Sequence, residues 1–362
     1  MKRRNKKISI ISRESDSKTL DVAMLEAELL KRGDDVTVLS RLLTKERSVK
    51  ALGYIGHVIR QEAAILASDV VVLDTYCIPA SMFPHHKRTK VVQMWHALGA
   101  VKKFGWQTVG KQGGSSERTA RLMKMHHGYD RVICVSDVTA GYFCEAFRVS
   151  RDRLVKCGLP RIDYIKSVAA GDRHDETASK ILAKYPQLKS GKKTVLYAPT
   201  FRRGKPVDVQ SIVDALDFDS FDLAVKLHPL YRADMSAAEA PDPESRSAKV
   251  IYDEDFSSFD WLSVADIIIS DYSSLVIEST LADKPLYVYA YDLEEYESGT
   301  GINMDFKSEA IAPYVFKDAR ELADAIKNGD YDIRKLREFR DKYIDIETEN
   351  CTAALADYIE SL

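Results

Sequence analysis

The sequence predicts an α/β fold with two Rossmann-like domains that face a central cleft. Three observations support this fold class. Short β-rich runs alternate with helical stretches along all 362 residues, as in parallel α/β units. The chain is longer than the roughly 250 to 300 residues at which single hydrophobic cores stop growing. The alternation also restarts after a small, polar and charged segment at 168–180, which makes that segment the expected linker.

The first half of the chain contains the strand candidates of the first domain. They share short runs of apolar, often β-branched residues and cover 7–12, 35–39, 69–74, 90–95, 131–135 and 154–157. The clearest helix is expected at 19–31, where Leu29 and Leu30 belong to an apolar set at helical spacing and Gly33 follows as a C-cap.

The second half of the chain repeats this alternation of strands and helices. Its strand candidates cover 194–198, 222–227, 250–252, 266–270 and 286–290. Residues 232–248 are rich in Ala, Ser, Pro and Glu and are expected to form a surface excursion, whereas the chain from Asp318 onward is helical by composition. We therefore expect an N-terminal domain at 1–172, a C-terminal domain at 173–340, and a last helix at 341–362 that braces the first domain.

The charge of the chain is nearly balanced but unevenly distributed. It has 53 basic and 55 acidic side chains and a net charge of −2, which excludes a nucleic-acid binder that depends on global basicity. No apolar run approaches the roughly 18 residues of a membrane span. Between Thr75 and Tyr129, however, nine Lys or Arg residues and five of the eight histidines stand against one acid, Glu117. This stretch is suited to an anionic partner.

The cysteines and the glycines exclude several classes of site. Five cysteines with no CxxC spacing indicate reduced thiols, a cytosolic compartment and no structural zinc. No GxGxxG follows the first strand and no Walker loop occurs, which argues against dinucleotide and simple ATP use. His, Cys and Asp residues do not cluster in the sequence as they would at a dedicated metal site, so none is predicted.

Ligands of open parallel sheets bind beyond the carboxyl ends of the strands, so the residues after each apolar run are the candidates. The run VVQMWHALGAVKKFG brings His96 to a strand end, with Lys102 and Lys103 one turn further on. A histidine in a cationic pocket is disfavoured as imidazolium, and a neutral imidazole can act as a general base. The alternative is a capped core histidine beside a solvated lysine pair.

Two strand ends of the second domain carry cations. The run VLYAPTFRRGK places Thr200, Arg202 and Arg203 in a tight loop, and guanidinium groups bind phosphate in a bidentate manner. In LAVKLHP, alternation directs Lys226 and His228 to the same side of the strand. A solvated loop and a hydrogen-bonded strand-edge histidine are the alternatives.

The most specific segment is ADIIISDYSSLVIESTLADK at 265–284. A buried strand leads into Asp271, and Ser273 and Ser274 follow where a helix is expected to begin. Two hydroxyl groups and free backbone N–H groups at a helix N-terminus form an anion site. Glu278, about one turn into the helix, would reach a ribose hydroxyl. The alternative is an N-capping serine followed by a core helix.

Taken together, WHALGAVKKFG, YAPTFRR, KLHP and ISDYSSLVIESTLADKPLYVYAYDLEEY resemble the CDP-glycerol glycerophosphotransferase family, the teichoic acid primases and polymerases of Gram-positive bacteria. The resemblance covers roughly residues 89–306. It implies a GT-B fold and an enzyme that transfers polyol phosphate from a CDP-linked donor to a hydroxyl of a lipid-linked acceptor, with release of CMP.

By motif position, the two essential histidines of the family fall on His96 and His228. The resemblance also implies donor binding in the second domain, with Arg202 and Arg203 near the diphosphate and Asp271, Ser273 and Ser274 at the anion site. In the hypothesis that combines both lines of reasoning, His96 deprotonates the attacking hydroxyl, and His228 and the basic residues stabilise the phosphates. Thr200, Lys226 and Glu278 complete the expected donor site.

The sequence departs from the family pattern in two respects. Many members have WHGTPLK where this chain has WHALGAVK, a variant associated with the subgroup that includes ribitol-phosphate enzymes. Only about 90 residues precede the matching region here, so we expect a primase or single-addition enzyme more than a long-chain polymerase.

An anionic, lipid-linked acceptor gives the basic stretch of the first domain a partner. The expected acceptor and membrane patch consists of Lys102, Lys103, Lys111, Arg118, Arg121 and Lys124. Each cation near an anionic surface contributes on the order of 1 kcal/mol. We therefore expect a cytoplasmic protein that associates peripherally with the inner face of the cell membrane.

Two other functions remain as alternatives: a GT-B glycosyltransferase that uses a nucleotide sugar, and a non-catalytic module that binds an anionic polymer or a membrane. The sequence requires no cofactor, although a divalent cation would suit the diphosphate. It leaves open CDP-glycerol or CDP-ribitol as the donor, one addition or many, a wall teichoic acid or a capsule product, and the oligomeric state.

Overall fold

The computed structural model describes residues 5–42, 49–111, 114–202, 206–227 and 250–362, with only the backbone for 49–53. The described chain forms two compact units. Unit 1 comprises Met1–Asp163, Gly299–Gly301 and Tyr343–Leu362, and unit 2 comprises Tyr164–Ser298 and Ile302–Lys342. The expected surface excursion at 232–248 lies outside the described residues.

Each unit contains a six-stranded sheet in which all strand pairs are parallel. The order in unit 1 is β2-β1-β3-β4-β5-β6, and its strands are β1 Lys7–Ser12, β2 Asp35–Ser40, β3 Val70–Leu73, β4 Lys90–Gln93, β5 Arg131–Cys134 and β6 Leu154–Lys156. The order in unit 2 is β12-β11-β10-β7-β8-β9, and its strands are β7 Lys193–Tyr197, β8 Phe221–Val225, β9 Val250–Tyr252, β10 Ile267–Ser270, β11 Leu286–Tyr289 and β12 Val315–Phe316.

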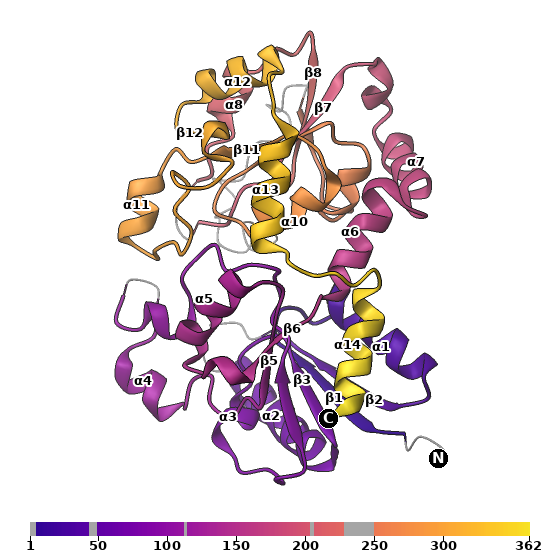
Figure 1. Cartoon of the computed structure of the whole chain (residues 1–362), viewed down its shortest axis with the longest axis vertical. Coiled ribbons are helices and arrows are strands. Elements are labelled where there is room, and N and C mark those ends of the chain that lie inside the picture. The colour runs from indigo at the N-terminus through magenta and orange to yellow at the C-terminus, as the bar shows by residue number, and fades with distance from the viewer. Residues whose placement is uncertain (1–4, 43–48, 112–113, 203–205, 228–249) are drawn as a thin grey trace. The chain divides into compact units, whose positions relative to one another are not determined.

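Helices connect these strands (Figure 1). They are α1 Leu20–Lys31, α2 Val49–Ala67, α3 Ile78–Met82, α4 Glu117–Leu122, α5 Asp137–Phe147, α6 Pro160–Ala170, α7 His174–Lys184, α8 Gln210–Ala215, α10 Leu275–Glu278, α11 Leu293–Ser298, α12 Ala319–Asn328, α13 Ile333–Tyr343 and α14 Cys351–Ser361. The α/β fold class is confirmed, because both sheets are parallel and strands alternate with helices along the chain.

The burial of the strands explains why the sequence pattern predicts them. All four residues of β3, and likewise of β10 and β11, are buried, as expected for strands covered on both faces. Every strand expected from the sequence is present, with ends that differ by at most two residues. The two-residue strand β12 was not expected, since so short a run has no periodicity to detect.

The structure corrects the expectation of a linker at 168–180. Helix α6 extends to Ala170 and α7 begins at His174, so most of this segment is helical. Asp175 and Glu176 occupy the first turn of α7, where acidic side chains favour a helix, and Ile181 anchors the helix by burial. The division between the units falls after Asp163, inside α6, rather than at 172.

The C-terminal helix packs on the first helix of unit 1. Figure 1 shows α14 beside α1, which it contacts. The Arg32 guanidinium links the two, because its Nη1 donates to Asp357 at 2.5 Å and to Glu360 at 2.9 Å. At the start of α14, the Asp163 carboxylate accepts the backbone N–H groups of Cys351 at 2.8 Å and Thr352 at 2.7 Å.

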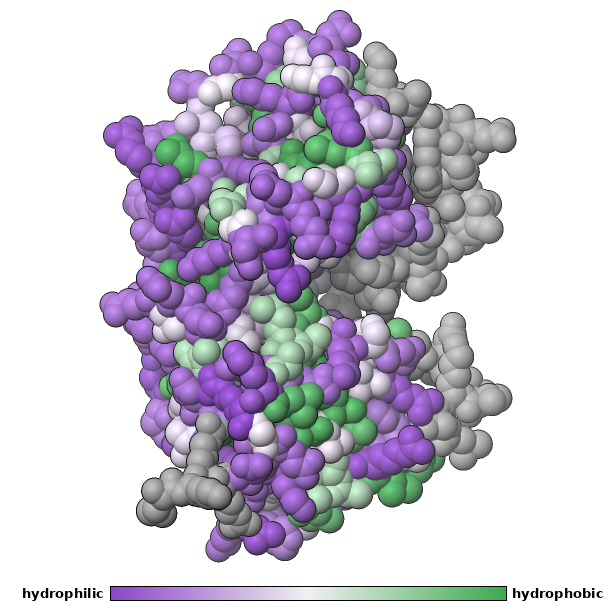
Figure 2. Space-filling model, turned by 90° about the vertical axis from the view of Figure 1, so that its right-hand side faces the viewer, coloured by the Kyte–Doolittle hydropathy of each residue, from purple (hydrophilic) through white to green (hydrophobic). Residues whose placement is uncertain are grey.

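The surface is mainly polar where it is visible. On the face that Figure 2 shows, hydrophilic side chains predominate and hydrophobic ones form smaller groups among them. Within the described ranges, no helix combines the length and the apolar character that crossing a bilayer requires.

Candidate active site

The candidate site of unit 1 lies at the carboxyl edge of its sheet. Strands β1, β3 and β4 are neighbours there, so the residues after them converge. They supply Arg13, Glu14, Thr75, Trp95 and His96 to the lining of a pocket of about 360 Å³. The structure thus places His96 in a pocket, as expected for a reactive residue rather than for a fully enclosed core histidine.

The hydrogen bond of His96 defines its tautomer. Its Nδ1 lies 2.9 Å from the backbone carbonyl oxygen of Asp74. Because a carbonyl only accepts, Nδ1 carries the hydrogen and donates it, which leaves Nε2 of the neutral ring as the nitrogen that accepts a proton. The nearest carboxylate oxygen, Glu14 Oε1, is 3.7 Å from Nδ1. This arrangement is the one that a general base requires.

The residue before His96 has an unusual backbone conformation. Trp95 has a φ of +63°, in the left-handed region that bulky residues rarely adopt. Its N–H donates to the Gln93 side chain at 2.9 Å, and its ring stacks on Phe104 with a centroid distance of 4.4 Å. The surrounding packing therefore maintains a strained turn that determines where His96 lies, as is common at functional sites.

The cation in this pocket is not one that the sequence analysis selected. Lys102 and Lys103 do not line it, and the Lys103 N–H donates to the carbonyl of Gly301 at 3.0 Å. Arg13 lines it instead, and its Nη1 donates to the carbonyl of Tyr76 at 2.5 Å. The strand-end rule applied to residues 7–12 would have identified Arg13 and Glu14.

Asp74 is a buried carboxyl group beside His96. The residue is only 1% exposed, and neither carboxylate oxygen makes a hydrogen bond of normal geometry to a described residue. Burial raises the pKa of the Asp74 carboxyl to about 6. The surroundings of His96 are therefore mixed in charge, because Glu14 and Asp74 add acidic groups to the cation Arg13.

In unit 2, Asp271 connects two neighbouring strand ends. It follows β10, is fully buried, and accepts the N–H of Thr200 at 2.9 Å on both oxygens. Thr200 follows β7, the neighbour of β10. The hydroxyl oxygen of Thr200 is buried and has no hydrogen-bond partner among the described residues. A buried hydroxyl without a partner is costly, so this group is available to a ligand.

Arg202 makes a buried ion-pair network at the same edge. Its Nη1 donates to Asp271 at 2.7 Å, while Nε and Nη2 donate to the two oxygens of Asp292 at 2.6 and 2.9 Å. Burial alone would raise the pKa of the Asp292 carboxyl, but the guanidinium holds it below its usual value. All three nitrogens of Arg202 are thus bonded within the protein, which favours a positioning role over direct phosphate binding.

Asp292 is a site residue that the sequence analysis did not select. It lies in the run YAYDLEEY, which follows β11. The run contains several acidic residues, but the partner of Asp292 in the network, Arg202, is 90 positions away in the sequence. Only the sheet order brings β7, β10 and β11 together at this edge.

Lys226 is also engaged by a carboxylate. It follows β8, and its Nζ lies 3.3 Å from Oδ2 of Asp253, which follows β9. Asp253 is buried and additionally accepts hydrogen bonds from Trp261 at 3.0 Å and Tyr185 at 2.7 Å. The expected site residues Arg203 and His228 lie outside the described residues, so their roles remain predictions.

The segment after Asp271 is less helical than expected. Helix α10 covers only Leu275–Glu278 before a 3-10 turn, and Ser274 makes no side-chain capping bond. Its hydroxyl instead donates to Oε2 of Glu278 at 3.1 Å, and Ser273 Oγ accepts the N–H of Leu275 at 3.3 Å. Ser274 therefore does not cap the helix, whereas Ser273 accepts an N–H at its start, and the expected anion site loses the support of a long helix.

Four of the six cations of the expected acceptor and membrane patch are exposed, and Lys102 and Lys103 are partly buried. Lys111, Arg118, Arg121 and Lys124 all reach solvent on α4 and its flanks. Arg121 pairs with Glu117 through Nη2 at 2.7 Å, which offsets part of its charge. In the described ranges, no group of three His, Cys, Asp or Glu side chains could hold a metal ion.

Comparison with known proteins agrees with this fold. The sequence matches the family described as "CDP-Glycerol:Poly(glycerophosphate) glycerophosphotransferase" over residues 1–361. It is 29% identical over 339 residues to the teichoic acid ribitol-phosphate primase of Bacillus spizizenii, covering 90% of this chain and 83% of that one. It is 28% identical over 315 residues to the teichoic acid glycerol-phosphate primase of Bacillus subtilis, covering 84% and 77%.

A solved structure shows the same fold. The H444N variant of the wall teichoic acid polymerase TagF aligns with a TM-score of 0.72 at 17% sequence identity, covering 99% of this chain and 89% of that one. This likeness supports the GT-B type of fold. Since the family match spans nearly the whole sequence, the chain belongs to the CDP-glycerol:poly(glycerophosphate) glycerophosphotransferase family.

Proposed function

We propose that the protein transfers glycerol phosphate or ribitol phosphate from a CDP-polyol to a hydroxyl of a lipid-linked teichoic acid or capsule-type acceptor. An acceptor oxygen attacks the phosphorus of the polyol phosphate, the bond to the bridging oxygen breaks, and CMP leaves. The family match and the primases that this chain resembles support a polyol-phosphate transferase. Phosphoryl transfer depends mainly on positioning and on stabilisation of charge, which strand-end residues supply.

The observation that carries the proposal is the hydrogen bond of His96. With Nδ1 donating to the Asp74 carbonyl at 2.9 Å, Nε2 takes the proton of the attacking hydroxyl. Glu14, at 3.7 Å from Nδ1, then stabilises the imidazolium that forms. Arg13, in the same pocket, offsets negative charge on a bound phosphate.

We assign binding of the CDP-polyol to unit 2. Thr200 supports this assignment through its buried hydroxyl, which has no partner among the described residues. Arg202, Asp271 and Asp292 form the frame that orients Thr200. Arg203, Lys226, His228, Ser273, Ser274 and Glu278 complete the proposed donor site. We further propose a cytoplasmic protein associated with the inner face of the membrane through its exposed cations.

The decisive experiment measures CMP release. The protein is incubated with CDP-glycerol, CDP-ribitol or a panel of UDP-sugars and a short lipid-linked acceptor, and product length is read by mass spectrometry. We expect CMP from one of the CDP-polyols. UDP release from a sugar donor would instead establish a glycosyltransferase, and binding without any turnover would establish a non-catalytic module. Because the sequence requires no cofactor, we expect activity to persist in EDTA; its loss would reveal a divalent cation.

The role of His96 is tested with His96→Asn. Removal of a general base typically lowers kcat by roughly 10² to 10⁴-fold, and we expect donor affinity to change little. His174→Asn is the control, because His174 lies partly exposed on α7, its ring bonds to the neighbouring Asp175 carboxylate, and it does not line the His96 pocket. Near-normal transfer by His96→Asn would show that another group is the base.

A further inference from the structure

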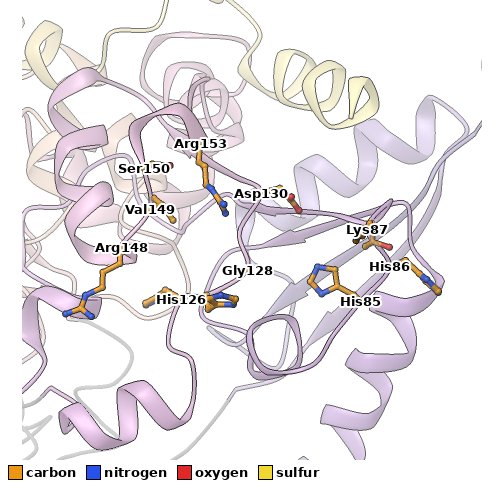
Figure 3. A pocket seen from close by; sticks show the side chains of 12 residues that line it. His85, His86, Lys87, His126, Gly128, Asp130, Arg148, Val149, Ser150 and Arg153 are labelled. Carbon is orange, nitrogen blue, oxygen red and sulfur yellow. The ribbon is translucent and has the colours of Figure 1, made fainter.

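A second pocket of unit 1 lies at the opposite, amino-terminal edge of the same sheet. It has a volume of about 700 Å³ and is formed by the segments that precede β4, β5 and β6 (Figure 3). Ligand sites of open parallel sheets normally lie at the carboxyl edge. This pocket contains none of the residues to which the transfer chemistry is assigned above.

The pocket is rich in cationic and imidazole side chains. Lys87, Arg148 and Arg153 carry permanent positive charge, and four histidines join them: His85, His86, His126 and His127. Among the described residues that line the pocket, Asp130 is the one acid, and its Oδ2 already accepts the N–H of Val91 at 2.8 Å. Even with every histidine neutral, positive charge exceeds negative charge, which favours an anionic ligand.

Arg153 and His85 are the two lining residues that indicate a ligand inside the pocket. The side chain of Arg153 extends toward Gly128 (Figure 3), and its Nη1 is fixed by a 2.5 Å hydrogen bond to the carbonyl of Tyr129. An arginine fixed in this way is preorganised for a planar, bidentate contact. Nδ1 of His85 is buried and has no hydrogen-bond partner among the described residues. Buried polar atoms are normally satisfied, so a ligand oxygen would complete this one.

The position of Arg148 limits its share of the binding. Its guanidinium lies 3.6 Å from the ring centroid of Trp106, a cation–π contact that directs the group away from the centre of the pocket. Lys87 and Arg153 are therefore the cations that we assign to a ligand.

This pocket adjoins the pocket of His96. His126 lines both, and Met125 on one side and His127 on the other belong to the same loop. His126 is 6% exposed and its Nδ1 lies 2.9 Å from the hydroxyl of Tyr129, so the loop that separates the two pockets is well anchored. A chain with repeating phosphates that passes over this loop would reach both pockets.

We propose that this pocket binds a phosphodiester group of the acceptor, at least one unit away from the hydroxyl that reacts. The inference rests on the proposed function, because the acceptor is taken to be a polyol-phosphate chain. Contacts with a remote unit hold the chain in register and add affinity for acceptors that already contain several phosphates. A membrane phospholipid has similar phosphate chemistry, but the shared loop favours a ligand that also enters the His96 pocket.

The test compares a single-unit soluble acceptor with an oligomer of several polyol-phosphate units. The variants are Lys87→Gln and Arg153→Gln. Arg151→Gln is the matched control, because Arg151 lies in the same short 3-10 helix as Arg153, pairs with Asp137 and does not line the pocket. We expect the affinity advantage of the oligomer over the single unit to fall about tenfold in each pocket variant and to be unchanged in the control.

Three results would overturn the inference. The oligomer advantage persists in both pocket variants; it falls equally in Arg151→Gln; or the variants lose binding to phosphatidylglycerol vesicles while their affinity for the oligomer is unchanged, which would assign the pocket to a lipid headgroup. Lys87 is exposed, so Lys87→Gln remains informative if Arg153→Gln unfolds. Direct binding of the oligomer, measured without donor, separates failure of this inference from absence of CMP release.

Discussion

Arg202 shows that a sequence can predict the position of a residue without predicting its hydrogen-bond partners. The sequence placed it at the end of a strand, and the structure agrees. Its bonds, however, go to Asp271 and Asp292 instead of being left open for phosphate. Bidentate arginine binds carboxylate and phosphate with the same geometry, so residue type alone cannot distinguish them.

We predict that Arg202→Met strongly destabilises the protein. The change leaves two carboxylates close together without their guanidinium, and breaking a buried ion pair typically costs about 3 to 5 kcal/mol. Urea denaturation should show a loss of this order in the free energy of unfolding. Arg334→Met is the control, because Arg334 is 86% exposed in its pair with Asp332 and should change stability by less than about 1 kcal/mol. Equal effects of the two variants would contradict a buried network.

We also predict that His126 makes stability depend on pH. Burial, with a smaller effect of Arg13, lowers the pKa of His126 to about 3, whereas the unfolded chain takes up this proton near 6.5. Between these values the unfolded state binds more protons, so stability falls as the pH drops below about 6.5, with a slope of up to ~1.4 kcal/mol per pH unit.

His126→Asn should remove this component. Asparagine cannot titrate, tolerates the φ of +58° at this position, and retains a group that can bond the Tyr129 hydroxyl. The difference in unfolding free energy between pH 7 and pH 5 should be smaller in the variant by about 2 kcal/mol. An unchanged difference would mean that His126 is not the group responsible.

At the scale of elements, the pattern of apolar runs was informative because both sheets are buried. Strand β1 was predicted with its observed bounds, and α1 within one residue. Errors occurred where a helix is short or polar. Helix α10 ends after one turn, and the polar segment before Ile181 is a helix rather than a linker. Composition cannot distinguish a solvated helix from a loop when one buried side chain anchors it.

The start of α14 provides a prediction at this scale. Asp163 on α6 accepts two N–H groups of α14, a cap supplied by a residue 188 and 189 positions away. Asp163→Ala should cost about 1 to 2 kcal/mol and should speed hydrogen exchange at the amides of Cys351 and Thr352. Asp172→Ala, an exposed acid after α6, is the control. Unchanged exchange at these two amides would show that the cap contributes little.

At the scale of the whole molecule, the near-zero net charge combines acidic regions with one basic stretch. Four cations of this stretch, Lys111, Arg118, Arg121 and Lys124, are exposed on α4 and its flanks in unit 1. Attraction to an anionic membrane therefore depends on where the charges lie, and it is screened by salt because the groups are exposed.

We predict that the protein sediments with phosphatidylglycerol vesicles more than with phosphatidylcholine vesicles, and that the preference declines from low to physiological salt. Arg118→Glu combined with Lys124→Glu should reduce it about tenfold or more, since two cations of ~1 kcal/mol each are reversed. Arg334→Glu combined with Lys335→Glu, the same charge change on unit 2, should have little effect. Equal losses would mean that net charge, rather than the patch, governs binding.

The sequence by itself determined the fold class, nearly every strand, the position of His96 at a strand end and the family. These depend on local periodicity and short motifs, which are properties of contiguous residues. The tertiary structure decided which strand ends are neighbours. It therefore decided which residues lie together. Arg13 and Glu14 line the pocket of His96, Asp292 binds Arg202, and a cationic pocket adjoins the loop of His126. Strand order is set by packing between distant segments, and a single sequence does not record it.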